Sequence, residues 1–515
     1  MFKRRKKREQ AARQAELKEA LRTGNLPALY RLLADGLVLH AQDQSGYDAL
    51  IHAAYGQSAA ILPVLDFLLA QGVPRSNRSK YGESALSVFS SRARFDGVQR
   101  LLDAGADEDF LNWTPLHRVV ALGSARDLAD ALRSQPQADD LETPDHCGRT
   151  PFLLALAAGS IDKARLLLDA GASPTVTARC DAPGLFMPIT GGHADALAWL
   201  LQQTWTEVDQ TDEFGSTALH KAIEYDQVEC VNLLIDAGAN VHHKAIYTPL
   251  ENATSCPIAL RLLDAGADPA HANHRVLLGL GHEDQDHEPN EAPLQAVTKA
   301  QFKRAAKPRF GTRNPEPIHE PFWDAMVRAG VTAYRAANHF GTDVFKLGHP
   351  TWCAQRFGQS LTLLPDGRAV QIAGEHEDSY DPDFCIYNDV FVHEPDGRIS
   401  IYAYPEAVFP PTDFHTATLI DDAIVIIGSL GYHDQRAYGT TPVFRLSLRD
   451  WRIEPTETHG DNPGWIHQHR AALIAPHTIR IWAGKVLTTK NDKERSADNT
   501  QTYTLDLAER RWSKL

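Results

Sequence analysis

Histidine, carboxylate and arginine side chains gather in two loops of the C-terminal third of the chain. Each loop follows a short Val/Ile-rich run that closes with a glycine, Gly374 or Gly428. Imidazole and carboxylate groups are the usual ligands of transition metals and the usual acids and bases of catalysis. If both loops leave one face of a β structure, they form a shared rim of seven such side chains: His376, Asp378, Asp381, Asp383, His433, Asp434 and Arg436.

The types of residue in this rim do not by themselves define a reaction. No fixed spacing such as His-Glu-x-x-His supports a metal centre, and a perturbed pKa cannot be read from a sequence. A third charged loop, residues 485–499, is expected on the same face. We predict a partner-binding or solvated rim with no metal and no cofactor, and hence no enzyme. The alternative is a hydrolase or lyase, metal-dependent or not, that acts at these loops.

Two histidines in the first half of the chain are equally conspicuous. His117 stands in Trp-Thr-Pro-Leu-His and His220 in Ser-Thr-Ala-Leu-His. Each follows, by three residues, a threonine that is suited to cap a helix N-terminus. Buried polar groups are normally hydrogen-bonded, so we predict that both imidazoles satisfy backbone groups and take no part in catalysis.

Both histidines belong to a repeated unit. The phrase Leu-Leu-Asp-Ala-Gly-Ala, or a close variant, recurs with glycines at 36, 72, 105, 171 and 238, which are 36, 33, 66 and 67 residues apart. These separations are one or two periods of about 33 residues. The glycine is expected just after a helix, where φ is positive. The pattern predicts about eight units of paired helices over residues 14–275. The sixth lacks its start phrase, and the eighth is too short for a complete first helix.

At these phrases the chain resembles ankyrin repeats. The resemblance implies an all-α solenoid that binds protein partners through its concave face and the tips between repeats, and that has no enzymatic activity. Aromatic residues at such tips are candidate hot spots, although Trp113 would fit equally well packed on its own repeat. The expected partner-binding residues at the tips are Tyr81, Asn112, Trp113, Glu213, Phe214 and Tyr247.

The pattern of the last third of the chain predicts β structure. Hairpin patterns at 361–374, 415–428 and 469–484 are each followed by a second hairpin, which gives three four-stranded units with a period near 50 residues. This arrangement resembles kelch blades and implies a β-propeller region. Closed propellers usually have about 4–8 blades. The three blades therefore need a cap, for which residues 300–350 are available, or a second copy of the chain that completes the propeller.

These observations predict a multidomain chain, an all-α ankyrin solenoid followed by all-β kelch-like propeller blades. The expected parts are a basic N-terminal tail at 1–13, the repeat array at 14–275, a linker at 276–347 with a docking helix near 321–340, and the blades at 348–515.

Composition limits the classes of partner. The net charge is −14, from 52 Lys and Arg against 66 Asp and Glu, which disfavours nucleic acid and suits a basic protein. Six cysteines form no CxxC pair, and no apolar run reaches the ~18 residues of a membrane span, so a cytoplasmic protein is predicted.

The combination of the repeat array with the kelch-like region resembles bacterial ankyrin-type interaction and immunity proteins. This resemblance implies a module that binds a protein partner and, as an immunity protein, neutralises a toxin.

Overall fold

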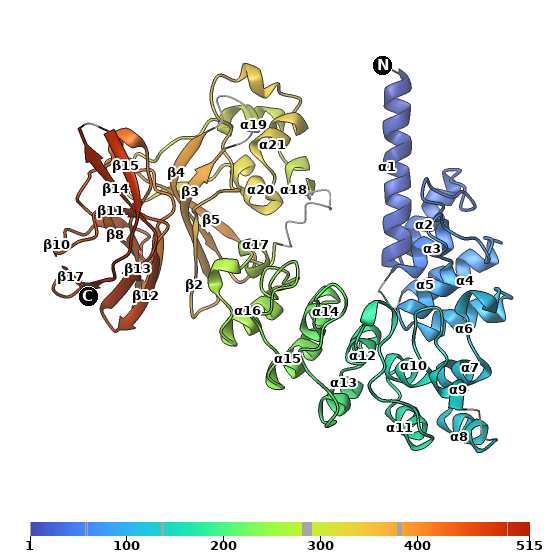
Figure 1. Ribbon diagram of the computed structural model, residues 1–515. Coiled ribbons are helices and arrows are strands. Elements are labelled where there is room, and N and C mark those ends of the chain that lie inside the picture. The colour runs from blue at the N-terminus through green and yellow to red at the C-terminus, as the bar shows by residue number, and fades with distance from the viewer. Residues whose placement is uncertain are drawn as a thin grey trace. The chain divides into compact units, whose positions relative to one another are not determined.

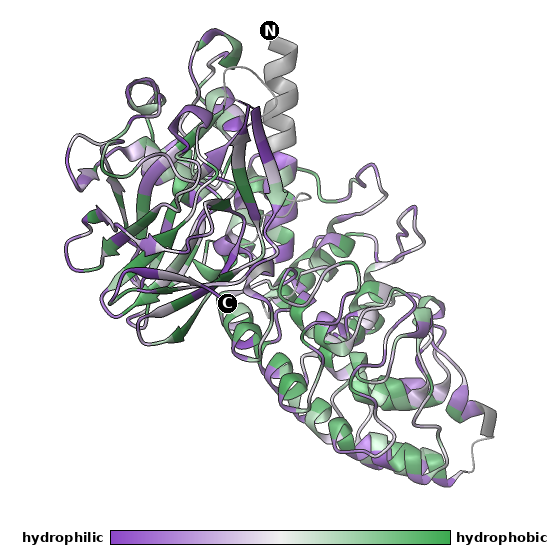
Figure 2. Cartoon of the chain, turned by 60° about the vertical axis from the view of Figure 1, so that its left-hand side comes forward, coloured by the Kyte–Doolittle hydropathy of each residue, from purple (hydrophilic) through white to green (hydrophobic). Residues whose placement is uncertain are grey.

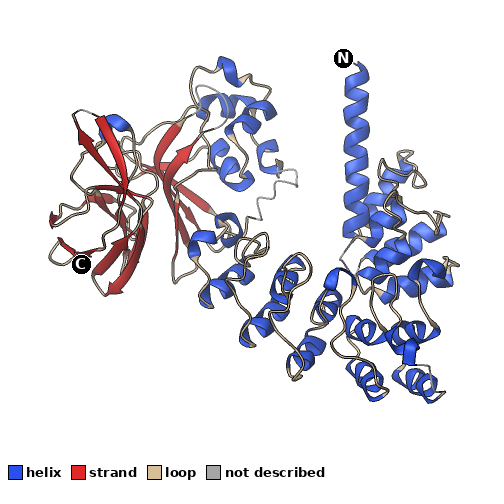
Figure 3. Cartoon of the chain, viewed as in Figure 1, coloured by secondary structure: helices blue, strands red, loops and turns tan. Residues whose placement is uncertain are grey.

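The computed structural model describes residues 2–56, 58, 60–134, 138–280, 291–377, 384–491 and 493–515. The chain separates into two compact units, Met1–Leu277 and Leu278–Leu515 (Figure 1). The described part of the first unit is helical, whereas the second contains helices and all the described strands (Figure 3). Hydrophobic segments follow the strands of the second unit and the helices of the first (Figure 2).

The first unit is a succession of short helix pairs joined by turns. Each pair buries apolar side chains against the preceding and following pairs, because one pair alone cannot cover its own hydrophobic face. Its helices are α1 (Phe2–Thr23), α2 (Leu26–Ala34), α3 (Ala49–Ala54), α4 (Ile61–Ala70), α5 (Ala85–Ser91), α6 (Phe95–Asp103), η1 (Glu108–Leu111), α7 (Pro115–Leu122), α8 (Ala125–Arg133), α9 (Ala138–Glu142), α10 (Pro151–Ala157), α11 (Ile161–Asp169), η2 (Arg179–Asp181), α12 (Phe186–Gly191), α13 (Ala194–Leu201), α14 (Ala218–Glu224), α15 (Val228–Asp236), α16 (Cys256–Asp264), η3 (Pro269–His271) and α17 (His274–Leu277).

The predicted helix boundaries are found. Thr114 and Thr217 precede α7 and α14 and form capping boxes with the histidines three residues later. Gly171 and Gly238 follow α11 and α15 with φ of 101° and 88°. In the eighth unit, residues 249–252 form a turn in place of a first helix, as its short length predicted.

The N-terminal segment is helical. Residues 1–13 were predicted as a basic tail outside the array, and they belong to α1, one helix of 22 residues that begins at Phe2 and continues into the array. Its last turns bury Leu17, Ala20 and Leu21 in the core of the first helix pairs. Helix α1 is therefore part of the first repeat.

The second unit contains four antiparallel sheets whose strands mostly follow one another in sequence. The sheet orders are β1-β5-β4-β3-β2, β6-β7-β8-β9, β10-β17-β16-β13-β12, in which only the β10–β17 pair is parallel, and β11-β14-β15. The strands are β1 (Glu316–Ile318), β2 (Ser360–Leu363), β3 (Ala369–His376), β4 (Cys385–His393), β5 (Ile399–Ala403), β6 (Thr416–Ile420), β7 (Ala423–Ile427), β8 (Val443–Ser447), β9 (Ile453–Pro455), β10 (His459–Gly460), β11 (Trp465–His467), β12 (Arg470–Ala475), β13 (Thr478–Trp482), β14 (Lys485–Lys490), β15 (Lys493–Asp498), β16 (Tyr503–Asp506) and β17 (Arg511–Lys514).

Three of these sheets contain the predicted four-stranded units. Strand β6 lies between β2 and β12, and the backbone N–H groups of Phe414 and Gln468 donate to the carbonyls of Gly358 and Phe414 at 2.9 and 2.8 Å. A closed propeller is not detected among the described residues. The loop predicted at 485–499 is a β-hairpin instead, because β14 and β15 pair with each other and with β11.

The stretch predicted as a linker is largely part of the second unit. It contains α18 (Ala292–Gln295), α19 (Lys299–Ala305), α20 (Pro321–Ala329), α21 (Ala333–His339) and η4 (Val344–Lys346). Gly330, at φ 64°, ends α20 and divides the expected helix 321–340 in two. Phe302, Phe322 and Trp323 share one hydrophobic core with Phe391 and Ile401 of the first sheet. These helices therefore cover a face of that sheet.

Candidate functional site

The turns between the helix pairs of the first unit follow one hydrogen-bonding pattern. In the turn at 212–216, the Oδ1 atom of Asp212 accepts from the backbone N–H groups of Phe214 and Ser216 at 3.0 and 2.8 Å. Asp43, Ser79 and Asp145 do the same in their own turns. The residue two places after the polar one is thereby held at the tip of the turn by local side-chain bonds.

Neighbouring tips are joined to one another through the backbone. Lys80 N–H donates to the Ser45 carbonyl at 2.9 Å, Arg179 N–H to the Cys147 carbonyl at 3.1 Å and Glu213 N–H to the Cys180 carbonyl at 3.0 Å. Each bond runs from one tip to the tip before it. The tips therefore form a row whose backbone is fixed while the residue at each tip varies.

Large apolar side chains stand exposed on this row. Tyr81 is 73% exposed, Phe214 64% and Tyr247 58%. Ile246, beside Tyr247, is 75% exposed, and sequence reasoning missed it although it stands in the same tip phrase. Glu213 is also exposed. Exposed aromatic residues on a preorganised backbone are the usual anchors of protein interfaces.

The tip at Tyr81 adjoins a tyrosine cluster. The hydroxyls of Tyr47 and Tyr55 donate to the two carboxylate oxygens of Glu83 at 2.7 and 2.5 Å, and the Tyr47 ring lies 6.3 Å from the Tyr81 ring. Burial, followed by the hydrogen bond to Glu83, raises the pKa of both Tyr47 and Tyr55. These hydroxyls therefore stay protonated and hold the rings in place.

Trp113 and Asn112 fit the predicted binding role less well. Trp113 is half-buried, its ring lies 6.3 Å from that of Phe95, and it packs on the core of the first repeats. Asn112 is exposed with φ 51°, and its amide donates to the Pro144 carbonyl at 3.0 Å. Trp113 therefore contributes to the array itself, and Asn112 serves to turn the chain.

The two histidines of the start phrases are structural, as predicted. Nδ1 of His117 and of His220 contacts the cap threonine, while Nε2 contacts the carbonyl of Arg149 or Tyr247 in the next unit, 3.1 Å away in each case. Burial lowers the pKa of both imidazoles. They therefore act as neutral bridges between neighbouring units.

The structure describes four of the seven residues of the predicted rim of the second unit. Asp378, Asp381 and Asp383 lie outside the described residues. His433 and Asp434 are exposed on η5 (His433–Gln435). His376 does not lie on an exposed rim as predicted: it is 3% exposed at the end of β3, a strand buried on both faces, and its Nδ1 lies 2.7 Å from the Gln355 carbonyl.

Arg436 was also predicted on the exposed rim, and the structure places it differently. Its guanidinium is largely buried and donates to the carbonyls of Leu430 and Gly431 and, at 2.6 Å, to Glu494 on β15. These bonds join the loop of the second sheet to the β14–β15 hairpin. The guanidinium is therefore engaged within the unit and is not presented to a partner.

Sequence reasoning missed a pair of carboxyl groups, Glu375 and Asp413. The Asp413 side chain is fully buried, and its Oδ1 atom accepts from the Gly431 N–H at 2.6 Å. Its Oδ2 atom has no donor among the described residues. Burial, and then the charge of Asp413, raises the pKa of Glu375 to about 7. The two carboxyl groups thus favour sharing a proton, and no motif in the sequence joins them.

Histidines at the start of the inner strands bridge neighbouring sheets. Nε2 of His415 lies 2.8 Å from the Ser360 hydroxyl, and Nε2 of His469 lies 2.9 Å from the Thr416 hydroxyl. Burial lowers the pKa of both histidines to about 3, so they are neutral near pH 7. Both histidines therefore act as neutral bridges between neighbouring sheets.

One group of side chains in the first unit has the composition of a metal site. Ligand atoms of Asp145, His146 and Cys147 all lie within 4.8 Å of one another. However, Asp145 accepts four hydrogen bonds, two of them from the Arg149 side chain, and both ring nitrogens of His146 face backbone carbonyls. The carboxylate already has its counter-ion, so this arrangement does not fit a metal.

Comparisons with known proteins agree with the helical pattern. The family model described as ankyrin repeats matches residues 185–273 in three copies. Ankyrin repeat protein nuc-2 of Neurospora crassa is 29% identical over 232 residues, 43% of this chain and 21% of that protein. Neurogenic locus notch homolog protein 1 of Homo sapiens is 28% identical over 181 residues, 34% of this chain and 6% of that protein.

The chain thus spans about a fifth of the first of these relatives and less of the second. Among solved structures, the human ASB11 ankyrin repeat domain aligns with 52% of this chain and 93% of that domain, at 20% identity and a TM-score of 0.25. None of the described helices is long and apolar enough to cross a membrane. The chain therefore contains ankyrin repeats, matched at residues 185–273, and a β-rich C-terminal region.

Proposed function

We propose that the protein is a binding protein whose row of repeat tips anchors a protein partner. The observation that carries this proposal is the exposure of Tyr81 and Phe214 on turns that hydrogen bonds hold in place, together with the exposure of Ile246 and Tyr247 on a later tip. Water-exposed apolar side chains of this size are costly to keep ordered unless a partner covers them. The net charge of −14 favours a basic partner through long-range attraction.

The resemblance to immunity proteins extends this proposal to sequestration of a basic toxin. The support for that extension is the acidic charge and the repeat architecture alone, so it rests on analogy of fold. The exposed pair His433 and Asp434 is proposed as an additional contact of the second unit, and charged rim residues mainly set the rate and the salt dependence of association.

The experiment is affinity capture with the full chain and two matched variants. Phe214→Ser combined with Tyr247→Ser removes two tip anchors. Phe345→Ser removes an aromatic ring of similar exposure, 70%, in the second unit. We expect a stoichiometric partner on the wild type and on Phe345→Ser, with a loss of at least tenfold on the tip variant, because an anchor typically contributes 2 kcal/mol or more. Equal capture by all three proteins would contradict the tip assignment.

A second candidate function is acid–base catalysis in the second unit. The observation that favours it is the Glu375–Asp413 pair, since two carboxyl groups with displaced pKa values can serve as an acid and a base. The hydrolase or lyase alternative rests on this pair. Metal analysis of the purified protein, together with turnover of a panel of ester and glycoside substrates by wild type and Glu375→Gln, separates this candidate from a binding rim.

A further inference from the structure

The sixth repeat departs from its neighbours at the end of its second helix. Four other repeats end their second helix in Asp-Ala-Gly-Ala or a close match, and the last residue of that phrase is buried: Ala106, Ala172, Ala239 and Ala267. The sixth repeat has Gln202-Gln203-Thr204-Trp205 there. An indole therefore stands where these four repeats have a methyl group and the first two repeats have Leu37 and Val73. Such local departures from a repeated rule are expected at functional places.

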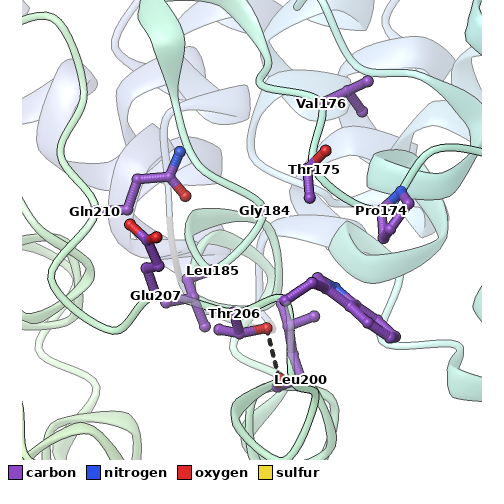
Figure 4. Close-up of a pocket in the computed structure, with 10 residues that line it drawn as sticks. Pro174, Thr175, Val176, Gly184, Leu185, Leu200, Thr206, Glu207 and Gln210 are labelled. Atoms are coloured by element: carbon purple, nitrogen blue, oxygen red, sulfur yellow. Dashed lines mark hydrogen bonds between the residues drawn. The ribbon is translucent and has the colours of Figure 1, made fainter.

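A cavity of about 180 Å³ lies beside this tryptophan, between the segments that follow α11 and α13. Figure 4 shows Glu207 and Gln210 on one side of it and Thr175 and Val176 on the other. Leu185 and Leu200 form an apolar part of the cavity wall. Sites for drug-sized ligands usually have about 300–1,000 Å³, so this cavity suits a single side chain or a molecule of that size.

Two polar side chains at the cavity are open to a ligand, whereas the Thr206 hydroxyl already donates to the Leu200 carbonyl. The Nε1–H of Trp205 is shielded from solvent and has no acceptor among the described residues. Leaving such a donor unpaired is unfavourable, because the group loses its hydrogen bond to water without gaining another. Glu207 and Gln210 are exposed at the cavity, and the described residues give the Glu207 carboxylate no ion pair. The site thus offers one buried donor and a carboxylate that can accept.

We propose that this cavity binds a carboxamide group. Its oxygen accepts from the Trp205 indole N–H, and its NH₂ group donates to the Glu207 carboxylate. A carboxylate ligand would be repelled by Glu207, and an ammonium ligand brings no acceptor for the indole. The source that fits the proposed function is an asparagine or glutamine side chain of the partner, so this part of the inference rests on the proposed function.

The first experiment measures ligand binding to the cavity in the absence of a partner. Full-length protein labelled with ¹⁵N in its tryptophan indoles is titrated with acetamide, with acetate and methylammonium as comparison ligands. We expect a saturable shift of the Trp205 indole resonance with acetamide only, and at least tenfold weaker binding in Glu207→Ala, because a hydrogen bond to a charged group is worth about 1.5–3 kcal/mol. Trp205→Phe assigns the resonance, and Glu207→Ala changes an exposed residue that the fold does not need.

Trp113 is the internal control, because its Nε1–H is also buried without an acceptor among the described residues. A shift of both indoles would show a nonspecific effect of acetamide and would overturn the site. The absence of a saturable shift, or an equal response to acetate or methylammonium, would also overturn it.

The second experiment identifies the source of the carboxamide. Acetamide at saturating concentration is added to the capture of the partner by wild type and by Glu207→Ala. Competition with the wild type only supports a partner side chain. Binding of acetamide without any effect on capture overturns the partner as source and assigns the cavity to a free small amide. If no partner is captured at all, the proposed function fails while the acetamide titration still decides the chemistry of the cavity.

Discussion

Each of the two units buries one arginine–aspartate pair, and the two pairs are built differently. In the first unit, Asp145 and Arg149 lie four residues apart in one tip turn, with side chains 0% and 4% exposed. In the second unit, Arg356 and Asp389 are separated by 33 residues and two strands, with side chains 0% and 5% exposed. One pair is local in sequence, and the other exists only after the first sheet has formed.

The local pair is part of the repeated turn. Asp145 already accepts from the backbone N–H groups of Cys147 and Arg149 at 2.8 and 2.9 Å. The Arg149 guanidinium adds two bonds to Asp145 and reaches back to the carbonyl and hydroxyl of Ser90, both at 2.9 Å. The ion pair thus reinforces a turn that the backbone would form without it.

The distant pair has aromatic surroundings instead. The Arg356 guanidinium lies 3.6 Å from the centre of the Tyr387 ring and 4.9 Å from that of Phe391. The Trp352 indole donates to Asp389 at 3.1 Å. Removing either charge would leave the other in an apolar core. We therefore expect the repeats, whose turns are held by local contacts, to lose less stability on removal of one ion pair than the sheet does. The sheet depends on two residues that are distant in sequence.

The largest expected effect is that of Arg356→Ala. We expect it to lower the free energy of unfolding of the second unit by about 3–5 kcal/mol, because Asp389 is left as an uncompensated buried charge. Hydrogen exchange of β3 and β4 peptides measures the loss. Arg356→Met combined with Asp389→Asn should recover part of it, and a loss below about 1 kcal/mol would show that the pair is not needed.

Arg149→Ala should have a smaller effect, about 2–3 kcal/mol on the first unit, because Asp145 keeps its two backbone donors. Hydrogen exchange of α5 and α10 peptides gives the value. The control is Arg165→Ala, an exposed arginine of the adjoining helix, which should change the stability by less than about 0.5 kcal/mol. A loss larger than that of Arg356→Ala would reverse the comparison.

Glu375 and Asp43 should contribute pH dependences of opposite sign to the two units. Folding raises the pKa of Glu375 to about 7, so its stabilising contribution is complete below the unfolded value of 4.5 and is lost as the pH rises through 7. His415 and His469, whose pKa values folding lowers, add a slope of the opposite sign to the same unit, so the Glu375 contribution is measured as the difference between wild type and Glu375→Gln. We expect this difference to fall by about 1–2 kcal/mol between pH 5 and 8, after allowance for solvent screening, and a difference that does not change with pH would remove the carboxyl pair from consideration.

The pH dependence that Asp43 contributes to the stability of the first unit has the opposite sign. Burial, which would raise its pKa, is outweighed by hydrogen bonds from Lys18, Tyr47 and Ser45, so the pKa is lowered to about 2. Its contribution is present above the unfolded value of 3.8 and is lost as the pH falls through 2. Thermal unfolding of Asp43→Asn from pH 2 to 6 should therefore show less acid destabilisation of α1–α3 than the wild type.

The smallest expected effects concern the bridges between sheets. Ser360→Ala and Thr416→Val each remove one hydroxyl that contacts a histidine of the next sheet, which should cost about 1 kcal/mol. Thr362→Val is the matched control on β2, because its buried hydroxyl has no partner among the described residues, and it should be neutral or stabilising. Urea unfolding compares the three. Equal losses would show that burial and not the histidine bridge matters.

The residues that sequence reasoning placed well are those with local causes. Thr114, His117, Gly171 and Gly238 act within one turn or between adjoining units, and their roles follow from capping and from positive φ. His376 was placed wrongly because a loop boundary was misjudged by one residue or two, and the side chain therefore fell on the buried end of β3. Because β3 is buried on both faces apart from the partly buried Glu375, a residue that belongs to the strand and not to the loop is buried.

The sequence by itself determined the helix pairs, the rigid tips and the hairpins, because each depends on residues within about one period of one another. The tertiary structure alone decided the Arg356–Asp389 pair, the Glu375–Asp413 pair and the cavity at Trp205. These features join segments separated by tens of residues, and burial then sets their energies. Distance along the chain says nothing about which distant side chains meet, and only the packed fold excludes the water that would otherwise screen them.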